Sequence, residues 1–155
     1  MAVARTPSLY SEPIAGFETI CFGLGLGIAV GLVTGATGVE GSARGRMAVV
    51  SAVIGLVIGY LLGSLLDGEA LLAGLAALVA SAFGCAVFSD VRAGANRRGA
   101  TAILGLGFVL AALVIAGLTV LLPWLGLLFL GATVWLAVTR GRRGPEKHAG
   151  LRVLR

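Results

Sequence analysis

Five long apolar stretches, separated by short segments that hold most of the charged residues, organise the chain. None of the five contains Lys, Arg, Asp or Glu. A helix needs about 20 residues to cross about 30 Å of hydrocarbon, and all but the last stretch reach that length. The pattern predicts an all-helical integral membrane protein with about five transmembrane helices. The expected spans are 19–39, 47–66, 70–89, 99–122 and 124–139.

The last two apolar stretches form one run that is interrupted only by the sequence LLPW at 121–124. A single helix over the whole run would be roughly twice as long as a bilayer is thick. Pro123 has no backbone donor and disfavours helix in the residue before it, so we expect a tight hairpin here. Trp124 would then lie at the membrane surface, where indole is favoured. Because the fifth stretch is short, a re-entrant or tilted arrangement stays open.

The composition also indicates a membrane protein. Hydrophobic residues make up 58% of the chain and charged residues only 12%, whereas a soluble domain has about 25% charged residues. Mean hydropathy is +1.03. The 155 residues include 25 glycines, and membrane helices tolerate glycine better than soluble helices do. This combination favours helices that pack closely on one another.

The charges between the apolar stretches predict the orientation. With five spans, all the Lys and Arg residues except Arg5 fall on one side of the membrane. Cytoplasmic loops carry such an excess of positive charge. We therefore expect the N-terminus outside, the C-terminus inside, and a location in the cell (inner) membrane. The chain divides into one transmembrane helical domain over residues 1–139 and a basic cytoplasmic tail over residues 140–155.

Glycine recurs at every fourth position in the first two apolar stretches, as in GIAVGLVTG and GLVIGYLLG. Residues four apart share a helix face, and membrane helices associate through close van der Waals contact, because lipid is as apolar as their side chains. We expect two smooth grooves whose midplane parts can meet, since the chain reverses between them. The first groove consists of Gly23, Gly27, Gly31 and Gly35, and the second of Ser51, Gly55, Gly59 and Gly63.

The third stretch carries small residues on two neighbouring faces. Ala77 and Ser81 belong to one face, and Ala80 and Gly84 to the other. Two such faces predict contact from two sides, so that the first three helices pack tightly through small-residue (glycine-zipper) faces. The fourth and fifth helices, rich in Leu, Val and aromatic residues, would form a lipid-facing outer layer. Packing within one subunit is the main interpretation of the grooves; oligomerisation through them and a glycine-lined pore are the alternatives.

Glu18 is a carboxylate at the outer edge of the first span. An ionisable group at membrane depth is costly and suggests a function by default, which makes Glu18 a candidate ion or proton site. An acidic residue near a helix N-terminus is also favourable against the helix dipole alone. A purely structural role therefore stays open.

Asp90 and Arg92 follow the third stretch and are candidate charges at an inner mouth. An ion pair between Asp90 and the neighbouring arginines at the membrane surface is the simpler interpretation. The remaining polar groups of the spans are mostly small hydroxyls. Such groups usually bond a backbone carbonyl or a neighbouring helix.

Residue types needed for catalysis or cofactor binding are scarce. The single histidine, His148, lies in the tail, so the spans offer no His/Cys cluster for a metal or haem and no Ser-His-Asp set. We expect no enzymatic activity, no metal and no cofactor, and an intramembrane enzyme stays open as the least favoured alternative. The basic tail can lie on anionic lipid, where each Lys or Arg contributes about 1 kcal/mol. Because the topology already accounts for the charge, nucleic acid is not an expected partner.

Two segments carry resemblances. The five-span layout and the closing sequence EKHAGLRVLR at 146–155 are similar to small multi-span inner-membrane proteins of bacteria. The sequence ALVASAFGCAVF at 77–88 resembles a segment in small subunits of amino-acid exporters. Neither resemblance implies catalytic or binding residues.

These observations predict a small polytopic membrane protein that acts as an oligomeric channel or transporter for ions or small solutes. A chain this short needs more than one copy to enclose a site, so a homo-oligomer is expected. The alternative is a structural or accessory subunit that uses the same grooves to bind another membrane protein.

Overall fold

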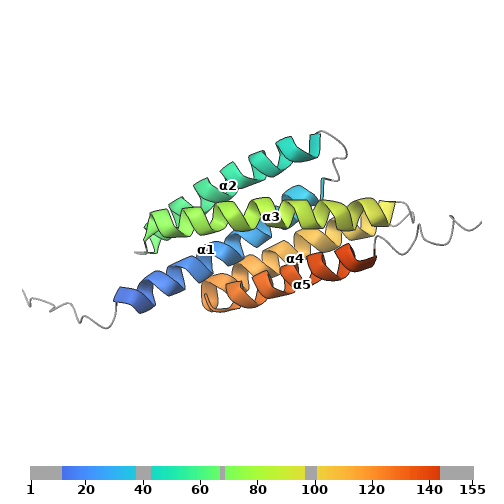
Figure 1. Cartoon of the computed structure of the whole chain (residues 1–155). Helices are drawn as coiled ribbons and strands as arrows, with labels where there is room; N and C mark the ends of the chain where they lie inside the picture. The colour runs from blue at the N-terminus through green and yellow to red at the C-terminus, as the bar shows by residue number, and fades with distance from the viewer. Residues whose placement is uncertain (1–11, 38–42, 67–68, 97–100, 144–155) are drawn as a thin grey trace, which may run out of the picture.

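The computed structural model describes residues 12–37, 43–66, 69–96 and 101–143, which form five α-helices. In chain order these are α1 (Glu12–Gly35), α2 (Ala43–Leu65), α3 (Ala70–Asn96), α4 (Thr101–Leu121) and α5 (Leu125–Arg143). Successive helices alternate in direction (Figure 1). The all-helical architecture with five helices is confirmed.

Four of these helices, α1 to α4, are long and apolar enough to cross a membrane. The apolar part of α5, Leu125–Arg140, is shorter. The helices extend beyond the charge-free stretches at several ends; α3, for example, continues past Ser89 to Asn96. The reason is physical: a helix can carry charged side chains where it leaves the hydrocarbon, because long side chains reach toward polar surroundings.

A turn at Pro123 separates α4 from α5, as the sequence predicts. The amide of Leu125 donates to the carbonyl of Leu122 at 3.0 Å, and the amide of Gly126 donates to the carbonyl of Pro123 at 2.9 Å. These two bonds satisfy backbone groups that the break in the helix would otherwise leave unpaired. Both helices on either side of the turn pack against α1.

Helix α1 lies at the centre of the bundle together with α3, since each of the two contacts all four other helices. The buried α1 side chains Ile28, Ala29 and Leu32 form a core with Ala80 of α3 and Ala112 of α4. Phe88 and Phe108 pack against this core with their ring centroids 5.9 Å apart. In Figure 1, α2 lies on one side of α3, while α4 and α5 lie on the other.

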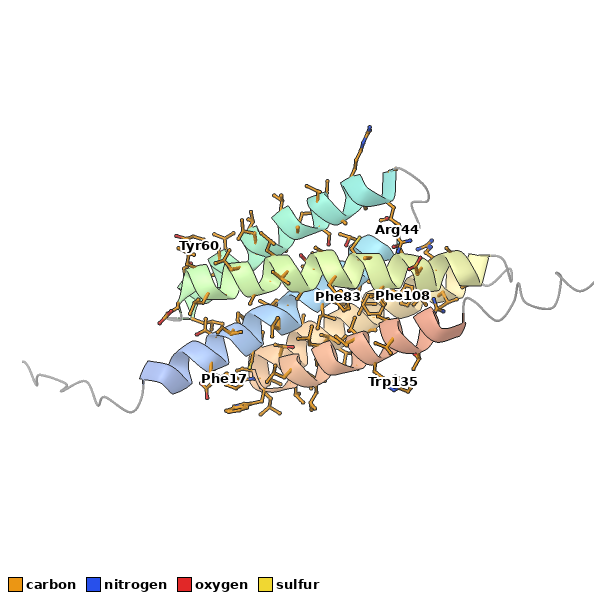
Figure 2. The ribbon with its side chains drawn as sticks, in the orientation of Figure 1. Phe17, Arg44, Tyr60, Phe83, Phe108 and Trp135 are labelled. Carbon is orange, nitrogen blue, oxygen red and sulfur yellow. The ribbon has the colours of Figure 1, made fainter. Side chains whose placement is uncertain are left out.

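The described arginine side chains gather at one end of the bundle, called here the arginine end. It comprises Arg44 and Arg46 at the start of α2, Arg92 near the end of α3 and Arg140 near the end of α5. Glu18 of α1 and Trp124 of the α4–α5 turn lie at the opposite end. Figure 2 shows Arg44 and Phe17 at these two ends.

Candidate functional site

The glycine face of α1 lies directly against the backbone of α3. A Cβ atom added at Gly23 or Gly27 would collide with the carbonyl oxygen of Ala73 or Ala77, respectively. A Cβ atom at Gly31 would come within 2.8 Å of the Ser81 carbonyl oxygen. Real Cβ atoms essentially never approach other atoms this closely, so each of these positions needs glycine while the two helices keep their contact.

The glycine face of α2 also packs on α3, and this corrects one expectation. A Cβ atom at Gly59 would lie 2.7 Å from the Cβ of Ala77, and one at Gly63 would lie 2.9 Å from the Cβ of Ala73. The two grooves therefore do not pack on each other. Helix α3, whose small side chains lie on two faces, receives one groove on each face.

Three of the predicted packing residues of α3 lie in its contacts with α1 and α2. Ala77 and Ser81 are 1% and 0% exposed. Gly84 faces Gly31 directly, since a Cβ at Gly84 would lie 3.4 Å from the Cα of Gly31. Gly35, one turn further along α1, lies over Phe88 and Ser89. Close backbone contact thus extends along most of α1.

Buried hydroxyl groups link the same three helices near the arginine end. The Thr34 hydroxyl on α1 donates to the Ser51 hydroxyl on α2 at 2.8 Å, and Ser51 donates to the carbonyl of Ser81 on α3 at 3.1 Å. The Ser81 hydroxyl donates to its own helix, at the carbonyl of Leu78. Every buried polar side-chain atom among the described residues has a hydrogen-bond partner. These hydroxyls therefore fix the register of the helices.

Glu18 lies near the start of α1, inside the apolar segment Gly16–Gly35, and is partly buried. Its neighbour Phe17 contacts Trp124 of the α4–α5 turn, with ring centroids 5.1 Å apart. Trp124 is 53% exposed, which suits a membrane-surface position. Among the described side chains no arginine lies at this end, so Glu18 has no cationic neighbour there.

Asp90 pairs with a different arginine from those expected. The Arg44 guanidinium on α2 lies 2.7 Å from the Asp90 carboxylate on α3, and the same guanidinium donates to the carbonyl of Ala86 at 2.7 Å. Arg92 instead reaches toward Gly105 of α4. Arg97 and Arg98 lie outside the described residues. Both side chains of the Arg44–Asp90 pair are substantially exposed, and such pairs contribute only about 0–1 kcal/mol to stability.

Two close contacts were not anticipated from the sequence. A Cβ atom at Gly25 would collide with Thr119 of α4, and one at Gly126 would collide with the Cys21 carbonyl of α1. Gly25 is outside the every-fourth pattern, and no glycine lies four residues from Gly126 in α5. The signal that could have found them is weak: Gly25 lies in a helix interior, where glycine disfavours helix by about 1 kcal/mol relative to alanine, and Gly126 is only the second residue of α5.

No protein-family model, curated protein or solved structure matches this chain. The metal-ligating residues His, Cys, Asp and Glu form no group of three or more within the described part of the chain. The tail beyond residue 143, with His148, lies outside it. The interpretation of the site therefore rests on the packing, the hydroxyl network and the placement of charge.

Proposed function

We propose that this chain is an integral protein of the cell membrane, with its N-terminus outside and the arginine end at the cytoplasmic surface. Four helices of sufficient length and apolarity support the membrane location. The gathering of Arg44, Arg46, Arg92 and Arg140 at one end supports the orientation, because positive charge is enriched on the cytoplasmic side. In this proposal α1, α2 and α3 form a core of glycine-zipper type, and α5 spans the membrane at a tilt or lies partly within it.

We infer that the protein is a structural or accessory membrane subunit. The observation that carries this inference is that the interior hydroxyls are already hydrogen-bonded within the bundle. Those of Thr34, Ser51 and Ser81 bond one another and the backbone, in a region filled by close helix contact. Polar groups in this state stabilise the bundle and are not free to line a solute path. The outward faces of α2, α4 and α5 would then contact lipid and a partner protein.

An oligomeric channel or transporter is the second candidate, and Glu18 is the observation that favours it. A partly buried carboxylate within an apolar helix suggests function by default. Because the centre of one chain is closely packed, a path would have to run between copies, with Glu18 at their interface. The anionic lipid expected at the tail is compatible with both candidates.

Particle mass and flux together separate the two functions. The protein is extracted together with its surrounding membrane, and the mass of the particles is measured. Ion and proton flux is measured in proteoliposomes for wild type, Glu18→Gln and the matched control Glu69→Gln. The accessory role predicts that the protein mass of the particles includes a second protein and is not a whole multiple of 15.6 kDa. It also predicts no flux above that of empty vesicles. A pure homo-oligomer with flux that Glu18→Gln abolishes and Glu69→Gln preserves would contradict it and establish the channel.

A further inference from the structure

Two arginines at the arginine end lie on the side of α3 that faces α4 and α5. The Arg92 guanidinium of α3 extends over α4, with Nη1 3.6 Å from the point where a Cβ on Gly105 would lie. The Arg140 guanidinium of α5 extends over α3, with Nη2 4.0 Å from the corresponding point on Gly94. Each guanidinium therefore rests on a glycine of the neighbouring helix, and the two meet the same short segment of α3.

The only carboxylate described at this end is engaged elsewhere. Asp90 pairs with Arg44 at 2.7 Å on the side of α3 that faces α2. Among the described residues this is the one ion pair, so the positive charge of Arg92 and Arg140 is not neutralised by a protein carboxylate within that part of the chain. Two unneutralised guanidinium groups on adjacent helices attract an anion that has several hydrogen-bond acceptor oxygens, such as a phosphate group. Arginine donates two parallel hydrogen bonds to such a group.

The surroundings favour a lipid as the source of that phosphate. Both arginines lie where apolar helices end, which in a membrane is the depth of the headgroups. Trp135, on α5 and 68% exposed, precedes Arg140 by five residues, about 7.5 Å along the helix. Figure 2 shows Trp135 on the outside of the bundle toward this end. Tryptophan at this depth contacts the boundary between headgroup and acyl chain.

We propose that an anionic phospholipid binds here, with its phosphate between Arg92 and Arg140. Basic pockets between helix ends on the cytoplasmic side bind anionic headgroups in this way. This site is distinct from the tail, because its arginines are held by helices. The inference rests on the proposed membrane location and not on the accessory role.

The experiment measures binding of single lipid molecules to the full chain in neutral detergent by native mass spectrometry. The probes are dioleoyl phosphatidylglycerol, dioleoyl phosphatidylcholine and inorganic phosphate. Wild type should bind phosphatidylglycerol in preference to phosphatidylcholine. Arg92→Gln and Arg140→Gln should each weaken the first binding event about fivefold, the factor that corresponds to about 1 kcal/mol per arginine. Arg46→Gln removes the same charge from the α2 side and should change the affinity for phosphatidylglycerol less than twofold.

A second pair of variants tests the position of the guanidinium without changing charge. Gly105→Leu places a side chain where the Arg92 guanidinium lies, whereas a Cβ at Gly107 meets nothing within 4 Å. Gly105→Leu should therefore weaken phosphatidylglycerol binding, and Gly107→Leu should not. Circular dichroism of every variant confirms that the helices are retained.

Three results would overturn the proposal. Equal losses in Arg46→Gln and Arg92→Gln would mean diffuse attraction by surface charge. Binding of inorganic phosphate without binding of phosphatidylglycerol would mean a soluble anion as ligand. Equal binding of the two lipids would mean no anion site. The proposed membrane location is tested separately. It would be contradicted if the wild-type chain stays in solution without detergent or lipid.

Discussion

Gly31→Leu is expected to destabilise the protein by about 3 kcal/mol or more, at the upper end of what overpacking in a core costs. A Cβ atom at this position would lie 2.8 Å from both the Cys85 amide nitrogen and the Ser81 carbonyl oxygen, and 2.9 Å from the Cα of Gly84. All three are backbone atoms of α3, which cannot rotate away as a side chain can. The helices α1 and α3 would have to separate. Reversible unfolding in mixed detergent measures the change in the free energy of unfolding.

The matched control for this substitution is Gly117→Leu. A Cβ at Gly117 in α4 meets nothing within 4 Å, and leucine favours helix over glycine by about 1 kcal/mol. We therefore expect the control to be as stable as wild type or more stable. Equal destabilisation by both variants would contradict the close contact of α1 with α3.

Gly126→Leu is expected to displace α5 from α1. Beyond its collision with the Cys21 carbonyl oxygen, a Cβ at Gly126 would lie 2.9 Å from the Cys21 carbonyl carbon and 3.1 Å from the Gly25 amide nitrogen. Cys21 and Gly25 share a face of α1, being four residues apart, and Cys21 is 0% exposed. Separation of α5 should therefore expose the Cys21 thiol.

Alkylation of Cys21 by a maleimide measures this effect, in a background in which the other cysteine is removed by Cys85→Ala. A loss of about 1.4 kcal/mol in the local stability of the α1–α5 contact raises the population of the open state about tenfold, and the alkylation rate should rise by at least this factor. Gly131→Leu, at a position in α5 where a Cβ meets nothing within 4 Å, is the control and should leave the rate unchanged. An unchanged rate in Gly126→Leu would show that α5 does not depend on this contact.

The number and kind of helices follow from the sequence because length, apolarity and the proline at 123 each act locally. The small-residue faces could also be recognised, since a spacing of four residues defines a helix face whatever lies opposite. Spacing does not define the neighbour. Spacing alone allows the grooves of α1 and α2 to meet, yet both pack on α3, because α3 has small residues on two faces and can approach both helices at once.

The pairing of Asp90 also could not be predicted from the sequence. The sequence places Asp90 and Arg92 as charges at the end of the third helix, but the partner of Asp90 is Arg44, which lies 46 positions earlier in the chain. Which arginine reaches Asp90 depends on how α2 crosses α3, and this is set by the contacts of Gly55, Gly59 and Gly63. Charge identity is local, whereas charge pairing depends on the packing of the whole bundle.

A double-mutant cycle on Gly27 and Ala80 tests most directly the central claim, that the glycine face of α1 packs on α3. A Cβ at Gly27 would lie 2.7 Å from the Cβ of Ala80, so Ala80→Gly removes part of the clash that Gly27→Ala creates. Each single variant should lose about 1–2 kcal/mol of unfolding free energy, and the double variant should recover at least about 1 kcal/mol of the summed loss. Losses that add within about 0.5 kcal/mol would show that the two residues do not meet, and would contradict the claim.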